Sequence, residues 1–119
     1  SEWAATEQLI ELGGQVVEGL LIVQNYDRDD ASTRFKEFSE AYFKRFQRKP
    51  GYSSVSAYDA ATVVLTALKN RKSGESMKDA ALRSGPYPGL QQTITFDANG
   101  DTPRKVFFTE IRDGRYVRI

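Results

Sequence analysis

The stretch that decides the fold lies in the last third of the chain and reads PGLQQTITFDANGD at residues 88–101. An alternating run from Arg104 to Ile119 follows it, with a second tight-turn pair at Asp113-Gly114. Asn-Gly and Asp-Gly pairs supply the positive φ angles that two-residue hairpin turns require. The pattern therefore predicts a β-meander, in which a strand, a tight turn, a strand, a second tight turn and a last strand follow one another.

Length and charge narrow the class of protein. At 119 residues the chain can form one domain with its own core. The net charge of +1 gives no electrostatic reason to expect nucleic acid or an anionic membrane as a partner. No apolar run approaches the roughly 20 residues that span a bilayer. The chain does not begin with Met, so we expect it to be part of a longer protein.

The composition also excludes several kinds of chemistry, because the chain contains neither cysteine nor histidine. A thiolate nucleophile, a disulfide, a thiolate zinc site and a Ser-His-Asp triad are therefore excluded within the chain. Residues 97–101, DANGD, begin like a calcium loop, but Thr102 and Phe108 stand where that loop needs Gly and a bidentate Glu. A hairpin turn is the favoured interpretation over calcium, and we expect no metal and no cofactor.

A nearly continuous apolar run, VVEGLLIV, occupies residues 16–23. A strand of this kind is usually covered on both faces, as in the parallel sheet of an α/β protein. Parallel strands need neighbours joined by crossover helices, and the sequence contains no second strand of this kind. We therefore expect most of the sheet to lie outside these residues. Exposed sheet edges and apolar helix faces then predict self-association.

Most of the remaining sequence predicts helices, because apolar side chains recur at three- and four-residue spacing between caps and Gly or Pro stops. The third helix is apolar nearly all round, which is typical of a helix buried between two layers. Its Asp59 is either functional or, as we favour, a partner for nearby backbone N–H groups. The expected helices are 6–12 with Thr6 as its cap, a second helix capped by Asp29 or Asp30 that runs to about Lys49, 55–68, and 76–82 with Ser76 as its cap. The second helix carries an aromatic stripe of Phe35, Phe38, Tyr42 and Phe46.

Three segments suit contact with a small ligand. In open parallel sheets ligands bind outside the carboxyl ends of strands, where Asn25-Tyr26-Asp27 follows the apolar run. Glu2-Trp3 immediately precedes the first helix and occupies an equivalent place if a strand ends just upstream. A carboxylate beside an indole suits a cationic or amino-bearing solute. The competing interpretation is that Trp3 packs against the sheet and Glu2 caps the helix. Residues 52–54, Tyr-Ser-Ser, join two helices at a candidate hinge.

Short motifs follow one another along the chain in an order that resembles the C-terminal part of type I periplasmic solute-binding proteins, closest to the branched-chain amino acid receptors. The match runs over essentially the whole chain. The motifs are Gly14-x-x-x-Glu18-Gly19, the aromatic-striped helix ending in Lys49-Pro50, Ala57-Tyr58-Asp59-Ala60, Gly89, and Phe96-Asp97-x-x-Gly100-Asp101.

The resemblance implies an α/β fold: a fragment of the type I periplasmic-binding-protein fold, with helices around a partial sheet and a C-terminal antiparallel β-meander. In the complete fold two lobes close on a small solute, and three crossover segments form the hinge. The resemblance assigns about residues 1–50 to the C-terminal lobe and the helices of 51–86 to the N-terminal lobe. It assigns residues 87–119 to the hinge strand and the meander.

The resemblance also implies a function. Proteins of this family deliver solutes to the membrane permease of an ABC importer and lack catalytic activity. The expected protein is a periplasmic or extracytoplasmic receptor for a small polar solute, such as an amino acid or a small carboxylate. Because the rest of the family pocket comes from the N-terminal lobe, we expect these residues alone to bind solute weakly or not at all.

The expected ligand-binding residues are Glu2, Trp3, Tyr26, Tyr52 and Ser53. By resemblance, Glu2 falls where relatives contact the amino group of the ligand. Ser53 falls at a hinge position where some relatives place an aromatic ring, and its neighbour Tyr52 is a candidate substitute. The serine at this position weakens the case for an amino-acid ligand.

Two other functions stay open at this stage. Phe107-Phe108 together with residues 113–117, DGRYV, resembles a sub-branch that serves cell-envelope proteins, including activators of penicillin-binding proteins. The alternative is therefore a ligand-sensing or protein-interaction module of a cell-envelope regulator. A small enzyme using Asp59 or Asp97 is disfavoured, because nothing in the sequence places two carboxylates across a cleft.

Overall fold

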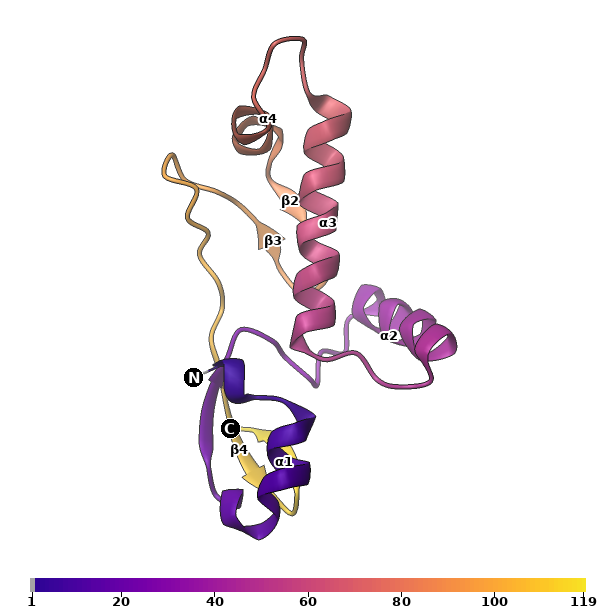
Figure 1. Ribbon diagram of the computed structural model, residues 1–119, viewed down its shortest axis with the longest axis vertical. Coiled ribbons are helices and arrows are strands. Elements are labelled where there is room, and N and C mark those ends of the chain that lie inside the picture. The colour runs from indigo at the N-terminus through magenta and orange to yellow at the C-terminus, as the bar shows by residue number, and fades with distance from the viewer. Residues whose placement is uncertain (1) are drawn as a thin grey trace. The chain divides into compact units, whose positions relative to one another are not determined.

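The computed structural model describes residues 2–119, with only the backbone of Glu2, and falls into two compact units. The first unit joins the segment ending at Asp30 to Lys105–Ile119, and the second comprises Ala31–Arg104. Each unit contains its own small sheet (Figure 1). The assignment of residues 1–50, 51–86 and 87–119 to lobes and hinge stays a prediction.

The sheet of the first unit has three antiparallel strands in the order β1-β4-β5. They are Leu21–Gln24, Phe107–Arg112 and Arg115–Arg118. The turn residues between β4 and β5, Asp113 and Gly114, have φ angles of 51° and 67°. Both values lie in the left-handed region that an Asp-Gly hairpin turn requires, so the second turn of the predicted meander is confirmed.

The apolar run at residues 16–23 is only partly a strand. Gly14–Val17 forms a short 3-10 helix, η2, and β1 begins at Leu21. Gly19 separates the two with a φ of 77°, a conformation that glycine adopts at low cost. Among the described residues β1 pairs antiparallel with β4 and lies at the edge of the sheet, with one side of the strand exposed. The prediction of a strand covered on both faces is therefore wrong for the described residues, and its parallel neighbours stay a prediction.

One face of this sheet is covered by helices from the N-terminal segment. They are η1 (Glu2–Ala4), α1 (Glu7–Gly13) and η2. The hydroxyl of Thr6 caps α1 by accepting the N–H of Leu9 at 3.3 Å, and the predicted first helix is confirmed to within one residue. The core of the unit consists of Ala5, Ile22 and Ile111, packed against Leu9, Ile10, Val17 and Tyr116.

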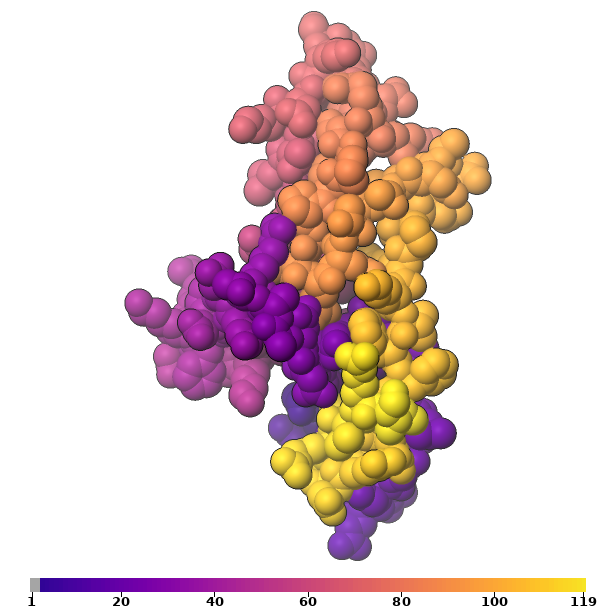
Figure 2. Space-filling model, turned by 180° about the vertical axis from the view of Figure 1, so that it is seen from behind, coloured from indigo at the N-terminus to yellow at the C-terminus, as the bar shows by residue number. Residues whose placement is uncertain are grey.

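The opposite face of the same sheet has no helix over it among the described residues. Leu21, Phe108 and Ile119 are 63%, 55% and 56% exposed. Figure 2 shows the C-terminal residues, in yellow, at the surface of the protein. The sheet therefore has one covered apolar face and one apolar face in contact with solvent.

The second unit is mainly helical, with α2 at Thr33–Phe46, α3 at Tyr52–Asn70 and α4 at Met77–Ser84. As predicted, Ser76 caps α4, and its hydroxyl accepts the N–H of Asp79 at 3.0 Å. Rings of the aromatic stripe on α2 contact one another, and Phe38 packs edge-on against Tyr58 of α3 with centroids 5.1 Å apart. The stripe is therefore confirmed, and one of its rings joins α2 to α3.

The start and end of α2 differ from the prediction. Ser32, rather than Asp29 or Asp30, is the cap, and its hydroxyl accepts the N–H of Phe35 at 3.3 Å. Asp29 lies instead in a turn closed by Asp27, whose Oδ1 accepts the N–H of Asp29 at 3.1 Å. The helix ends at Phe46, before the predicted Lys49, because Gln47 adopts a left-handed conformation with a φ of 54°.

The helix α3 is less buried than its composition predicts. Only Val55 and Ala67 are buried, whereas Leu65 and Leu68 are 65% and 51% exposed. The elements that α3 contacts most extensively are α4 and β2, and they leave one apolar side uncovered. The prediction of a helix buried between two layers is therefore wrong for the described residues. Across residues 2–119, which the structure describes, no helix is both long and apolar enough to cross a bilayer.

The predicted meander is divided between the two sheets. β2 (Tyr87–Pro88) and β3 (Thr93–Ile94) pair with each other in the second unit, whereas β4 pairs with β1. The Asn99-Gly100 turn forms, but it does not join two paired strands. The Asp97 side chain closes it by accepting the N–H groups of Asn99 and Asp101, both at 2.9 Å. Local hydrogen bonds therefore replace the first predicted hairpin.

Replacing Ile111 by Ala should lower the free energy of unfolding by about 2–5 kcal/mol, because a fully buried side chain leaves a cavity in a small core. The exposed Ile119 is the matched control, and its change to Ala should alter stability by at most about 0.5 kcal/mol. Urea unfolding followed by circular dichroism measures both. Equal effects of the two substitutions would contradict the assigned core.

Candidate functional site

The carboxyl end of β1 carries a group of polar and aromatic side chains in the first unit. Gln24, Tyr26 and Arg28 follow one another at two-residue spacing as the chain leaves the strand. Gln24 and Tyr26 are buried, and Arg28 is partly buried. We refer to these three residues as the β1-end cluster.

Arg28 ties this cluster to the first helix and to the sheet. Its guanidinium donates to the carbonyl of Ala5 at 3.1 Å and to the carboxylate of Glu7. It also lies over the rings of Tyr116 and Tyr26, at 4.2 and 5.6 Å from their centroids. Because Glu7 is largely exposed, the ion pair itself adds little stability. The fixed position of Arg28 comes from stacking and the backbone contact together.

The two tyrosines around Arg28 are neutral hydrogen-bonding groups. Burial raises the pKa of Tyr26, and the nearby Arg28 guanidinium opposes that rise. Burial also raises the pKa of Tyr116, whose hydroxyl donates to the carbonyl of Thr6 at 2.6 Å. The cluster therefore presents phenol, amide and guanidinium groups, but no nucleophile with a neighbouring base.

A second contact closes this end of the sheet. The carboxylate of Asp27 accepts a hydrogen bond from Arg118 at 2.8 Å, and the Arg118 guanidinium lies 5.2 Å from the centroid of the Phe107 ring. Asp27 follows β1 and Arg118 ends β5, so the ion pair joins two strands that are not neighbours in the sheet. Asp27 belongs to the segment that was predicted to contact ligand, and in the structure it pairs with Arg118.

The predicted ligand-binding residues fall in both units. Trp3 and Tyr26 belong to the first unit, in which η1 lies against β1. The Trp3 side chain is 74% exposed, so it does not pack against the sheet. Tyr52 and Ser53 begin α3 in the second unit, with Ser53 exposed. The side chain of Glu2 lies outside the described residues, and the roles of all five stay predictions.

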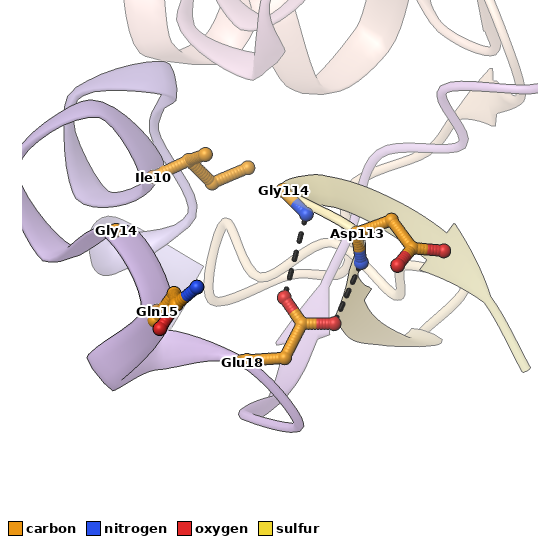
Figure 3. A pocket seen from close by; sticks show the side chains of 6 residues that line it. All are labelled: Ile10, Gly14, Gln15, Glu18, Asp113 and Gly114. Carbon is orange, nitrogen blue, oxygen red and sulfur yellow. Dashed lines mark hydrogen bonds between the residues drawn. The ribbon is translucent and has the colours of Figure 1, made fainter.

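An open pocket of about 600 Å³ lies at the other end of the sheet, near the start of β1 (Figure 3). It is lined in part by Glu18, whose carboxylate accepts the N–H groups of Asp113 and Gly114 at 2.6 and 3.4 Å. This carboxylate holds the β4–β5 turn in place. The remaining lining residues are Ile10, Gly14 and Gln15.

Asp59 has a structural partner in the second unit. Its Oδ1 accepts the N–H of Leu90 at 2.8 Å, which connects α3 to the loop between β2 and β3. Burial raises the pKa of Asp59, and this hydrogen bond and the charges of Arg104 and Arg34 oppose the rise. Asp59 accepts a backbone N–H, but the predicted role at the start of the helix is wrong, because α3 begins at Tyr52 and the N–H belongs to a loop that is distant in the sequence. Close by, a Cβ on Gly89 would meet the carbonyl oxygen of Gln92 at 2.3 Å, so only glycine fits there.

No group of three or more potential metal ligands occurs among the described residues. The acidic loop at residues 97–101 uses the Asp97 carboxylate for its own backbone. Sequence reasoning missed Gln24 and Arg28. The signal that could have indicated them is a glutamine that ends an apolar run, followed by Tyr26 and Arg28 at two-residue spacing.

Comparison with known proteins identifies the family. A family model described as "Periplasmic binding protein" matches residues 2–115. No curated protein matches the sequence. The chain is similar to the solved leucine binding protein LivK from Thermotoga maritima, with 26% identity and a TM-score of 0.83. That match covers 96% of this chain and 33% of the LivK chain.

Two further solved structures share the fold. The branched-chain amino acid transporter substrate binding protein LivJ from Streptococcus pneumoniae, in complex with isoleucine, is 19% identical with a TM-score of 0.81; the match covers 96% of this chain and 35% of LivJ. A solute binding protein of an ABC transporter from R. palustris, in complex with benzoate, is 14% identical with a TM-score of 0.70. That match covers 93% of this chain and 32% of the R. palustris protein. The chain thus spans about a third of the length of these proteins.

Replacing Asp59 by Ala should lower the free energy of unfolding by about 1–3 kcal/mol, because the buried N–H of Leu90 loses its acceptor. Asp59→Asn keeps an acceptor and should cost less. The folded-state pKa of Asp59 is raised above 3.8. Its contribution to stability is therefore fully present below that value and is lost as the pH rises through the folded-state pKa.

Wild type should accordingly gain stability over the Asn variant as the pH falls from neutral towards 3.8. Chemical unfolding of both proteins across this range measures the difference. A difference that does not change with pH would show that Asp59 is not the titrating group.

Proposed function

We propose that this chain, which belongs to the periplasmic binding protein family, forms part of an extracytoplasmic receptor that binds a small polar solute for an ABC importer. The observation that carries the proposal is the family match over residues 2–115 together with a fold shared along 96% of the chain with LivK. The partners in this proposal are the solute and the membrane permease that accepts it.

We locate the proposed solute site at the carboxyl end of β1. Trp3, on η1 beside β1, offers an exposed indole face, and Tyr26 lies two residues beyond the strand. An indole attracts cationic groups, and a phenol and a guanidinium donate to carboxylates. Ligand contacts of Glu2, and of Tyr52 and Ser53 in the second unit, stay predictions from the sequence. This arrangement favours an amino acid or a small carboxylate as the solute.

The solved relatives bind solutes of these classes. LivK is described as a leucine binding protein, LivJ is in complex with isoleucine, and the R. palustris protein is in complex with benzoate. All three solutes combine a carboxylate with an apolar group. We extend this class to the present chain as a proposal, without a choice between amino acid and aromatic acid.

The full-length protein that contains these residues should show a raised Tm with at least one solute of a panel of L-leucine, L-glutamate, L-lysine and benzoate, because a ligand that binds only the folded state stabilises it. At a ligand concentration of 100 times Kd the gain is about 2.7 kcal/mol. Differential scanning fluorimetry measures it. The control is Trp3→Ala, which should reduce the shift. No response of wild type to any solute would count against the receptor.

The isolated chain should also self-associate, and we propose that a second copy covers the exposed sheet face. Leu21, Ile119 and Phe108 are apolar side chains that are more than half exposed on this face, and the net charge of +1 opposes association only weakly. Light scattering should give a mass above that of one 13.4 kDa chain, rising with concentration. Phe108→Glu should lower that mass. A mass of one chain at high concentration would refute the proposal.

A further inference from the structure

Gln24 is the one buried residue of the β1-end cluster whose side-chain polar atoms lack partners. It is 1% exposed, and among the described residues neither its amide nitrogen nor its amide oxygen has a hydrogen-bond partner. By contrast Thr109, the other buried polar residue of this sheet, donates from its hydroxyl to the carbonyl of Ile22 at 3.2 Å. Gln24 thus differs from Thr109 although both lie on the covered face.

Such an amide is costly for a folded protein. A buried polar group without a partner loses its hydrogen bonds to water and gains none in return. An apolar side chain of similar shape would fill the same space without this cost. Buried unpartnered groups are rare in folded proteins, and where they occur they often serve a function at the expense of stability.

The position of Gln24 indicates what that function is. It ends β1 at the edge of the sheet, next to η1 with Trp3 and two residues before Tyr26. The Nε atom of Arg28, farther along the same cluster, is also buried without a partner. The cluster therefore offers two donor nitrogens, Gln24 Nε2 and Arg28 Nε, and one acceptor, the Gln24 oxygen.

We propose that Gln24 is a specificity-determining residue of the solute site, where its amide recognises a solute that carries both a carboxylate and a hydrogen-bond donor, as amino acids and hydroxy acids do. The carboxylate takes the N–H donors, and the ammonium or hydroxyl group donates to the Gln24 oxygen. Because the amide is closed to solvent, the contact runs through a bridging water or follows a shift of η1. This inference rests on the proposed function and adds the identity of the selecting residue.

The test replaces Gln24 by Met, which keeps the length of the side chain and removes its polar atoms, in the full-length protein. Calorimetric titration with L-leucine, L-glutamate, L-lysine and benzoate gives the affinities, and Tm of the unliganded protein gives the stability. Gln24→Met should lower the affinity for the bound amino acid about tenfold or more, and that for benzoate less. Without solute its Tm should equal or exceed that of wild type, because an unpartnered amide is removed.

The matched control is Thr109→Val, which removes a partnered hydroxyl from the same face. It should lower Tm and leave the affinities unchanged. Gln24→Leu serves as the second variant if the Met variant fails to fold. Unchanged amino-acid affinity in a folded Gln24 variant, or a fall in its unliganded Tm like that of Thr109→Val, overturns the role of Gln24 alone. If wild type binds none of the four probes, the proposed function and this inference both fall.

Discussion

The antiparallel pairing of β1 with β4 is the constraint on which the first unit depends. It joins Ile22 to Thr109 across most of the sequence, and the Thr109 hydroxyl adds a hydrogen bond to the Ile22 carbonyl. In the sequence, the two paired segments are separated by residues 31–104, which form a unit of their own. Without this pairing Ile111 would not meet Ile22 and Ala5, and the face that α1 covers would not exist. Closing so long a loop costs entropy, which the buried contacts of this core must offset.

The pairing also creates the place where we locate function. It fixes the carboxyl end of β1 beside η1, so that Gln24, Tyr26 and Arg28 leave the strand next to the N-terminal helices. Arg28 then donates a hydrogen bond to the Ala5 carbonyl and stacks on Tyr116 of β5. These contacts hold three separate segments of the chain together. The site that we propose for a small solute offers hydrogen-bonding groups and ring faces.

The uncovered surfaces follow from the same architecture. A three-stranded sheet with a helix layer on one face leaves its other face open, and α3 likewise keeps an apolar side exposed. The chain spans about a third of the length of its solved relatives. Apolar side chains that have no cover in the described residues are consistent with a piece of a larger fold, in which further elements lie on these faces.

Local features were determined by the sequence itself, because they depend on neighbouring residues. The Thr6 and Ser76 caps, the Asp113-Gly114 turn and the aromatic stripe of α2 all formed as predicted. The family resemblance, read from the order of motifs, is also confirmed. Only the tertiary structure decided that β1 pairs antiparallel, that the meander is split between two sheets, and that Gln24 is buried without a partner. Strand partners and burial depend on residues far apart in the chain, and periodicity within one segment carries no information about them.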